Sequence, residues 1–362
     1  MKELIKKYKK NFILLFIISF IIYLIIIIKN DTANISDKIS AFDIRYLPLI
    51  LSLLLLYVFL EGVAIYLFSR YTIKGLTLFD CVRVNLATQF FNAITPFASG
   101  GQPFQVVYFH SRGIKVKDST SIVVMNFITY SIAFVIVGLI CLVLKYPTFD
   151  TLLKGSGYRY LVFVGITINI FVTLLTVFLA FSKKLYYILI EVLWKKIIKW
   201  PIIRRFNLET KTDQISNMIL DYQEKIKELK HKRSLWFLSL IIHIIRVLIF
   251  VVIPLIIFKA LGEDLSGLWL TLGAASMFVN IIMSYVPTPG ASGGAEGVFY
   301  LFFNLFFTSQ IVVPGLLLWR LITYYLYILA GFLALVTLNY KNNLKDLNYN
   351  NVYNIEEENS LE

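Results

Sequence analysis

The sequence predicts an all-α polytopic membrane protein. Of its 362 residues, 58% are hydrophobic and 16% are charged, whereas soluble domains carry about 25% charged residues. The hydrophobic residues occur in uninterrupted runs of about twenty, the length of helix that crosses a hydrocarbon core of roughly 30 Å. Because backbone polar groups cannot face lipid unpaired, these runs must be helices.

Six runs are long enough to be complete spans. A basic N-terminus precedes the first, and no small-residue cleavage site follows it, so we expect a retained span rather than a signal peptide. The six spans cover 11–28, 47–68, 119–144, 158–181, 234–258 and 311–338. Two further apolar segments, 77–113 and 267–307, are interrupted by proline and glycine, which break helices.

The loop charges orient these segments, because cytoplasmic loops are enriched in lysine and arginine. The first ten residues carry five lysines, and basic residues also flank the segment 77–113. No lysine or arginine occurs between Lys259 and Arg320, which places both ends of 267–307 outside. We therefore expect a bacterial inner-membrane protein with both termini cytoplasmic, in which each interrupted segment returns to the side where it entered.

Two topologies satisfy these charges: six full spans plus two re-entrant helical hairpins, or eight spans. The return arm at 102–110 is short and polar for a span, which favours the hairpins. The two breaks are nearly the same sequence, TPFASGGQ at 95–102 and TPGASGGA at 288–295, with six of eight positions identical. This match predicts an inverted internal repeat, 11–144 and 158–338, within a single membrane domain, 1–362.

The breaks predict a binding site for an anion. Proline ends each arm, paired glycines allow close backbone approach, and Ser99 and Ser292 are expected to be the N-caps of the returning helices. Free N–H groups at a helix N-terminus suit a phosphate. The candidate residues at the two breaks are Thr95, Pro96, Ser99, Gly100, Gly101, Gln102, Thr288, Pro289, Ser292, Gly293, Gly294 and Glu296.

Ionisable residues within spans add to this site, since a charge in the bilayer usually faces a cavity or a partner. Arg246 and Arg320 are candidates for a lipid phosphate, because guanidinium binds phosphate in a bidentate way. Glu296 would either form a static ion pair with an arginine or receive a cationic group. Asn92 and Asn126 are expected to line the same groove, whereas Glu61, Arg83 and Arg112 are expected to snorkel to the cytoplasmic interface.

The rest of the chain shows no cofactor, metal or catalytic motif. The loop 182–233 is basic and amphipathic, as in interfacial helices, and the tail 342–362 is expected to be disordered. The net charge of +13 is attributed to orientation and to anionic membrane lipids as partners rather than to nucleic acid. A homo-oligomer is left open.

The paired TPxASGG segments, and above all PTPGASGGAEGVF at 287–299, resemble the lysylphosphatidylglycerol synthase transmembrane (flippase-like) family over nearly the whole chain, 10–340. The resemblance implies a membrane domain that moves an aminoacylated or other phospholipid between leaflets. In full-length relatives a separate cytosolic domain transfers lysine to phosphatidylglycerol. We find no such domain in this sequence, so the label phosphatidylglycerol lysyltransferase would apply by homology without its chemistry. Gln102 stands where an acid would mirror the second hairpin.

The function expected from these features is a lipid translocase that binds an anionic phospholipid or a polyprenyl phosphate between the two hairpins. Without a nucleotide motif, transport would be passive or ion-coupled. The alternatives are a membrane-embedded head-group transferase and a small-solute or ion transporter of the same architecture.

Overall fold

The computed structural model describes residues 32–72, 76–154, 159–182, 223, 226–227 and 232–338. The predicted span 11–28, most of the loop 182–233 and the tail 342–362 lie outside these residues. Within the described part, the regular elements are helices, and one isolated β-type bridge pairs Pro96 with Pro289. The all-α prediction is confirmed.

Five of the predicted spans are helices long and apolar enough to cross a membrane. They are α3 (Leu47–Thr72), α6 (Val116–Leu152), α7 (Arg159–Phe181), α12 (Arg233–Ala260), and α15 (Ser309–Arg320), which continues through a π-helical turn (Leu321–Tyr325) into α16 (Leu326–Thr337). The first of these follows the short helix α2 (Thr32–Ser40) and a 3-10 turn (Ile44–Tyr46). The chain is therefore a multi-pass membrane protein.

Both interrupted segments are pairs of short helices. The first pair is α4 (Leu78–Ile94) and α5 (Gly101–Ser111), and the second is α13 (Trp269–Met283) and α14 (Gly294–Phe303). With 11 and 10 residues, the returning arms α5 and α14 are about 17 Å and 15 Å long at 1.5 Å per residue. That is about half of a 30 Å hydrocarbon core, so the re-entrant topology fits better than eight spans.

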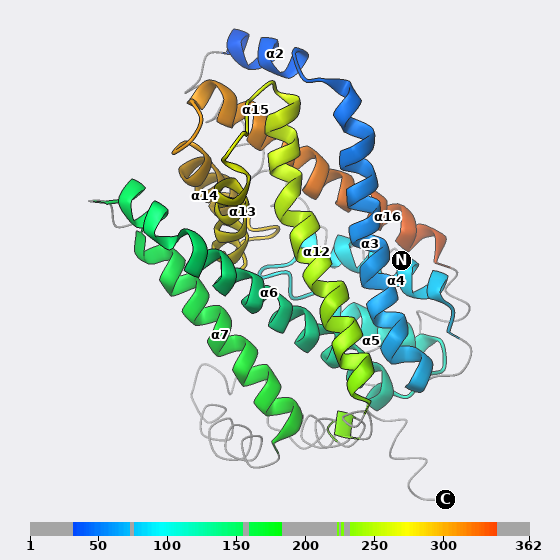
Figure 1. Ribbon diagram of the computed structural model, residues 1–362. Coiled ribbons are helices and arrows are strands. Elements are labelled where there is room, and N and C mark those ends of the chain that lie inside the picture. Colours follow the sequence, from blue (N-terminus) through cyan, green and yellow to red (C-terminus); the bar gives the residue numbers. More distant parts are fainter. Residues whose placement is uncertain are drawn as a thin grey trace, which may run out of the picture.

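The two hairpins approach from opposite ends of the helix bundle. Helices α3 and α12 run antiparallel, since the Asp43 N–H donates to the carbonyl of Ala260 (2.8 Å) at one end and Lys232 Nζ lies 3.6 Å from the Tyr71 ring centroid at the other. The first hairpin begins where α3 ends, and the second begins where α12 ends (Figure 1). Their tips meet at the bridge between Pro96 and Pro289. This is the inverted arrangement that the duplicated motif predicts.

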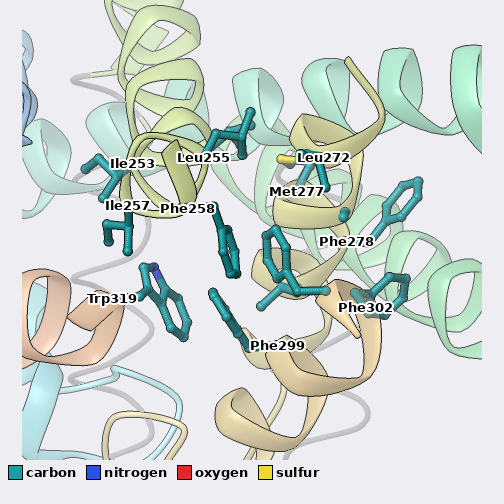
Figure 2. Packing of buried hydrophobic residues seen from close by; sticks show 14 of the residues in the cluster. Ile253, Leu255, Ile257, Phe258, Leu272, Met277, Phe278, Phe299, Phe302 and Trp319 are labelled. Carbon is teal, nitrogen blue, oxygen red and sulfur yellow. The ribbon is translucent and has the colours of Figure 1, made fainter. Parts of the chain in front are cut away.

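An aromatic core holds the second hairpin (Figure 2). Phe299 of α14 stacks on Trp319 of α15 with ring centroids 4.6 Å apart, and Phe258 of α12 stacks on Phe307 at 4.5 Å. Such pairs add about 0.5–1.5 kcal/mol each beyond the area they bury. The second tip is therefore built on a rigid support.

The first hairpin packs instead on α16. A Cβ atom at Gly331 would lie 2.7 Å from the carbonyl oxygen of Leu86 and 2.9 Å from the backbone nitrogen of Phe90, so only glycine allows this close crossing. At the open end of the hairpin, Arg83 donates to the carbonyl of Thr337 and Arg112 pairs with Asp80 (3.5 Å). Both arginines thus lie away from the tip.

Candidate functional site

A cavity of about 540 Å³ lies where the two hairpin tips meet. This volume is within the range of sites that bind small molecules, about 300–1,000 Å³. Seven amide side chains line it, from α4, α5, α6, α7 and α13: Gln89, Asn92, Gln102, Gln105, Asn126, Asn169 and Asn280. Tyrosine and phenylalanine side chains make up much of the remaining wall: Tyr57, Phe127, Tyr130, Phe250, Tyr324 and Tyr327.

One buried ion pair at the cavity joins α3 to α12. Arg246 Nη2 lies 2.6 Å from Glu61 Oε2, and the arginine side chain is 2% exposed. Its Nε donates to the carbonyl of Tyr57 (3.2 Å), and its Nη1 donates to His243 Nδ1 (2.9 Å). Every nitrogen of the guanidinium therefore has a partner. Arg246 is held in place rather than left open to a ligand.

The same network fixes His243 in its neutral form. Arginine has no acceptor, so His243 Nδ1 must accept the bond from Arg246 and carry no proton. The other ring nitrogen, Nε2, then donates to Asn126 Oδ1 (3.1 Å). Glu61 Oε2 also accepts from Gln89 Nε2 (3.2 Å), which extends the network into the first hairpin.

The second buried ion pair braces the tip of the second hairpin. Arg320 Nε lies 2.8 Å from Glu296 Oε1, and Glu296 Oε2 accepts the N–H of Gly293 (2.7 Å). Arg320 Nη1 donates to the carbonyl of Gly290 (3.2 Å). In the part of the chain that the structure describes, Arg320 Nη2 is buried without a hydrogen-bond partner. Of the two arginines on the cavity wall, Arg320 is the one with a free donor group.

A π-helical turn begins directly after Arg320, at Leu321. Such turns are rare in proteins, and those that occur are often at functional sites, because the extra residue changes the direction of the nearby side chains. One of those side chains is Tyr324, whose hydroxyl donates to the carbonyl of Ala93 in the first hairpin (3.0 Å). A Cβ atom at Gly290, where φ is +60°, would lie 2.0 Å from that hydroxyl oxygen. Tyr324 therefore touches both hairpins.

The predicted serine caps are wrong. The N-cap residues are Gly100 for α5 and Gly293 for α14. Ser99 Oγ donates to the carbonyl of Pro96 (2.9 Å), and the Ser292 side chain is buried and does not cap α14. In each hairpin another side chain takes the place expected for the serine.

At each tip, the N–H group of the N-cap residue is not free for a ligand. The N–H of Gly100 donates to Thr95 Oγ1 (2.9 Å), and the N–H of Gly293 donates to the Glu296 carboxylate. One N–H group at the start of each returning helix is therefore already bonded within the protein. An anion in the cavity would be recognised by side chains rather than by these two backbone groups.

The structure brings only some of the predicted residues to the cavity wall. Asn92, Gln102, Asn126, Arg246 and Arg320 line it. The other predicted residues shape or brace the tips behind the wall: Thr95, Pro96, Ser99, Gly100, Gly101, Thr288, Pro289, Ser292, Gly293, Gly294 and Glu296. The two tips also differ, since 96–99 are exposed whereas Pro289, Ala291 and Ser292 are buried.

Sequence reasoning missed several wall residues. Glu61 was expected to snorkel to the interface, and this is wrong because it pairs with the buried Arg246. The sequence did contain a sign of this, because a single acidic residue within an apolar span usually faces a charged partner or a cavity. Tyr57 and Tyr324 carried no signal in the sequence, because tyrosines occur throughout the spans.

The family model for the lysylphosphatidylglycerol synthase TM region matches residues 12–331. The chain belongs to this family. The matched region includes both hairpins and the whole of α3, α6, α7 and α12, and it ends within α16. Within the described residues, no group of three or more His, Cys, Asp or Glu side chains is placed to hold a metal ion.

Two proteins are similar in sequence to about 70% of the chain. A UPF0104 membrane protein of Archaeoglobus fulgidus is 29% identical over 276 residues, which are 74% of this chain and 79% of that protein. An uncharacterized protein of Mycoplasma pneumoniae, named as the MG306 homolog, is 23% identical over 69% of this chain and 65% of its own length. No solved structure matches the chain.

Proposed function

We propose that this protein binds the head group of an anionic membrane lipid in the cavity and moves it between the leaflets. The observation that carries the proposal is Arg320, which lines a polar cavity at the junction of the two hairpin tips and keeps Nη2 without a partner. A buried donor on a charged group is costly unless something binds it. Nη2 is buried in this state, so a phosphate oxygen would reach it after a shift of the Arg320 side chain toward the cavity.

The inverted arrangement supports transport over static binding. Hairpins that enter from opposite ends and meet in the middle occur in transporters in which the substrate site alternates between the two sides. The exposed tip 96–99 and the buried second tip make the two halves unequal in this state. One face of the junction is therefore more open than the other, as expected of one end state of such a cycle.

A lipid suits the wall better than a small polar solute does. The amides and arginines can hold a head group, while the aromatic rings can hold the upper part of acyl chains. Phe97, at the first tip, lines the cavity and is 57% exposed, so the apolar part of the wall extends outward. Phosphatidylglycerol, which carries one negative charge, is the first ligand to test. Lysylphosphatidylglycerol, which the family description names, is the second, because it has the same phosphodiester but a cationic lysyl group.

The test is lipid movement in vesicles that contain the purified protein. A fluorescent anionic phospholipid in both leaflets is quenched from outside, and the protein should raise the quenched fraction above that of empty vesicles. The double variant Glu296→Gln/Arg320→Gln keeps two hydrogen-bonding side chains but removes both charges, and it should abolish this increase. Arg45→Ala, at an exposed position outside the cavity, is the matched control and should transport as the wild type does.

The proposal is overturned if no anionic lipid moves faster than in empty vesicles. Movement of a soluble anion across the bilayer, with no lipid movement, would indicate a solute transporter instead. Chemical change of the lipid in these vesicles would indicate the head-group transferase.

A further inference from the structure

We propose that the cavity takes up one proton, on Glu61, together with each anionic head group, so that lipid movement is coupled to a proton gradient. The inference rests on the proposed function and adds its energy source. Coupling is inferred from the charged residues of the cavity. Among the described residues, Glu61, Arg246 and Arg320 line the cavity wall, and Glu296 lies behind the wall, paired with Arg320.

These four charges cancel. Two guanidinium groups face two carboxylates, and His243 is neutral because Arg246 donates to its Nδ1. A head group with one negative charge would therefore leave the cavity with a net charge of −1. A net charge in the bilayer interior is costly. One proton on a carboxylate restores neutrality.

Glu61 is the carboxylate placed to receive that proton. Both of its hydrogen bonds, from Arg246 Nη2 and Gln89 Nε2, end on Oε2, and no bond among the described residues ends on Oε1. Its side chain lines the cavity and is 15% exposed. Glu296, by contrast, uses Oε1 for Arg320 and Oε2 for Gly293 and lies off the wall. Solvent in the cavity can thus reach Glu61 directly.

The other titratable groups around Glu61 cannot take this role. His243 would have to break its bond with Arg246 and place a second cation 2.9 Å from the first. Arg246 stays protonated at all ordinary pH values. Three tyrosines also line the cavity: Tyr57 on α3, Tyr130 on α6 and Tyr327 on α16. Their hydroxyl groups are already protonated at neutral pH and cannot take up another proton.

The cycle that follows balances charge and protons. With the cavity open to one side, the anion binds at Arg320 and Glu61 takes a proton from water on that side. The protein with the neutral complex bound then closes the cavity on that side and opens it on the other. The anion and the proton leave together on the second side. Because linkage is reciprocal, the proton must tighten anion binding by the same factor by which the anion tightens proton binding.

The experiment is calorimetry on the full chain in detergent, with dihexanoyl phosphatidylglycerol as the soluble lipid probe. Repeating the titration in buffers of different ionisation enthalpy gives the number of protons bound per lipid. The wild type should bind about one, and its Kd should rise tenfold per pH unit over the pH range in which the proton is taken up on binding. Glu61→Gln should bind no proton and show a Kd independent of pH, whereas Asp264→Asn, in an exposed loop, should behave as the wild type.

A second probe separates the head group from the whole lipid. Glycerophosphoglycerol carries the same phosphodiester without acyl chains, and binding with one proton would show that the head group alone suffices. Lipid binding without proton uptake in the wild type would overturn the coupling and leave the proposed function intact. Failure of both probes to bind at any pH would overturn both.

Discussion

Replacing Gly290 by alanine should release the contact between the two hairpin tips. The new Cβ would lie 2.0 Å from the hydroxyl oxygen of Tyr324 and 2.2 Å from its Cζ, so the ring must move. The ring is 8% exposed and closely packed, so it has little room to do so. Movement would break the hydrogen bond from the Tyr324 hydroxyl to the carbonyl of Ala93. This bond joins the π-helical turn to the first hairpin.

The expected loss of stability has three parts. An alanine at a φ of +60° costs about 1–2 kcal/mol. The lost hydrogen bond adds about 0.5–1.5 kcal/mol. Overpacking against the ring adds about 1–3 kcal/mol. The backbone part is common to any glycine at positive φ, so the loss of stability specific to the contact with Tyr324 should be about 1.5–4.5 kcal/mol.

Gly267→Ala is the matched control for this experiment. Gly267 has a φ of +73°, and nothing lies within 4 Å of its added Cβ. Unfolding of both variants by denaturant in mixed micelles measures the difference, and the vesicle assay tests whether lipid movement is lost with it. Equal destabilisation by the two substitutions would show that the tips do not depend on the Gly290–Tyr324 contact.

Three further substitutions test the junction, each by thermal unfolding in detergent. Arg320→Gln alone should destabilise the protein by about 3–5 kcal/mol, because it leaves Glu296 buried and unpaired, and Glu296→Gln in the same chain should recover most of that loss; a double variant as unstable as the single one would contradict this. Tyr324→Phe should cost about 1 kcal/mol, through one hydrogen bond, with no effect expected if the tips are held by the backbone alone. Gly331→Leu should separate α16 from α4, since even a Cβ there meets the carbonyl of Leu86 at 2.7 Å; an unchanged melting temperature would refute this close crossing.

The sequence by itself determined that this is a helical membrane protein, where its five described spans lie, and where the two hairpins break. Long apolar runs have no other stable structure in a bilayer, because every backbone group must be paired within its own helix. Proline and glycine act through the backbone of the residues where they stand, so the broken helices were predictable to within a few residues. The duplicated TPxASGG segment then predicted that the two halves meet, and in the structure an isolated bridge pairs Pro96 with Pro289.

Only the tertiary structure decided which charged groups have partners. The sequence could not show that Arg246 is fully engaged while Arg320 keeps one free donor, because their partners come from α3, α12 and the second tip. Nor could it show that Thr95 and Glu296 replace the expected serine caps. An ion pair or hydrogen bond forms only where donor and acceptor atoms from residues far apart in the chain come within about 3 Å of each other. Those distances follow from how the helices pack, and packing is a property of the whole bundle.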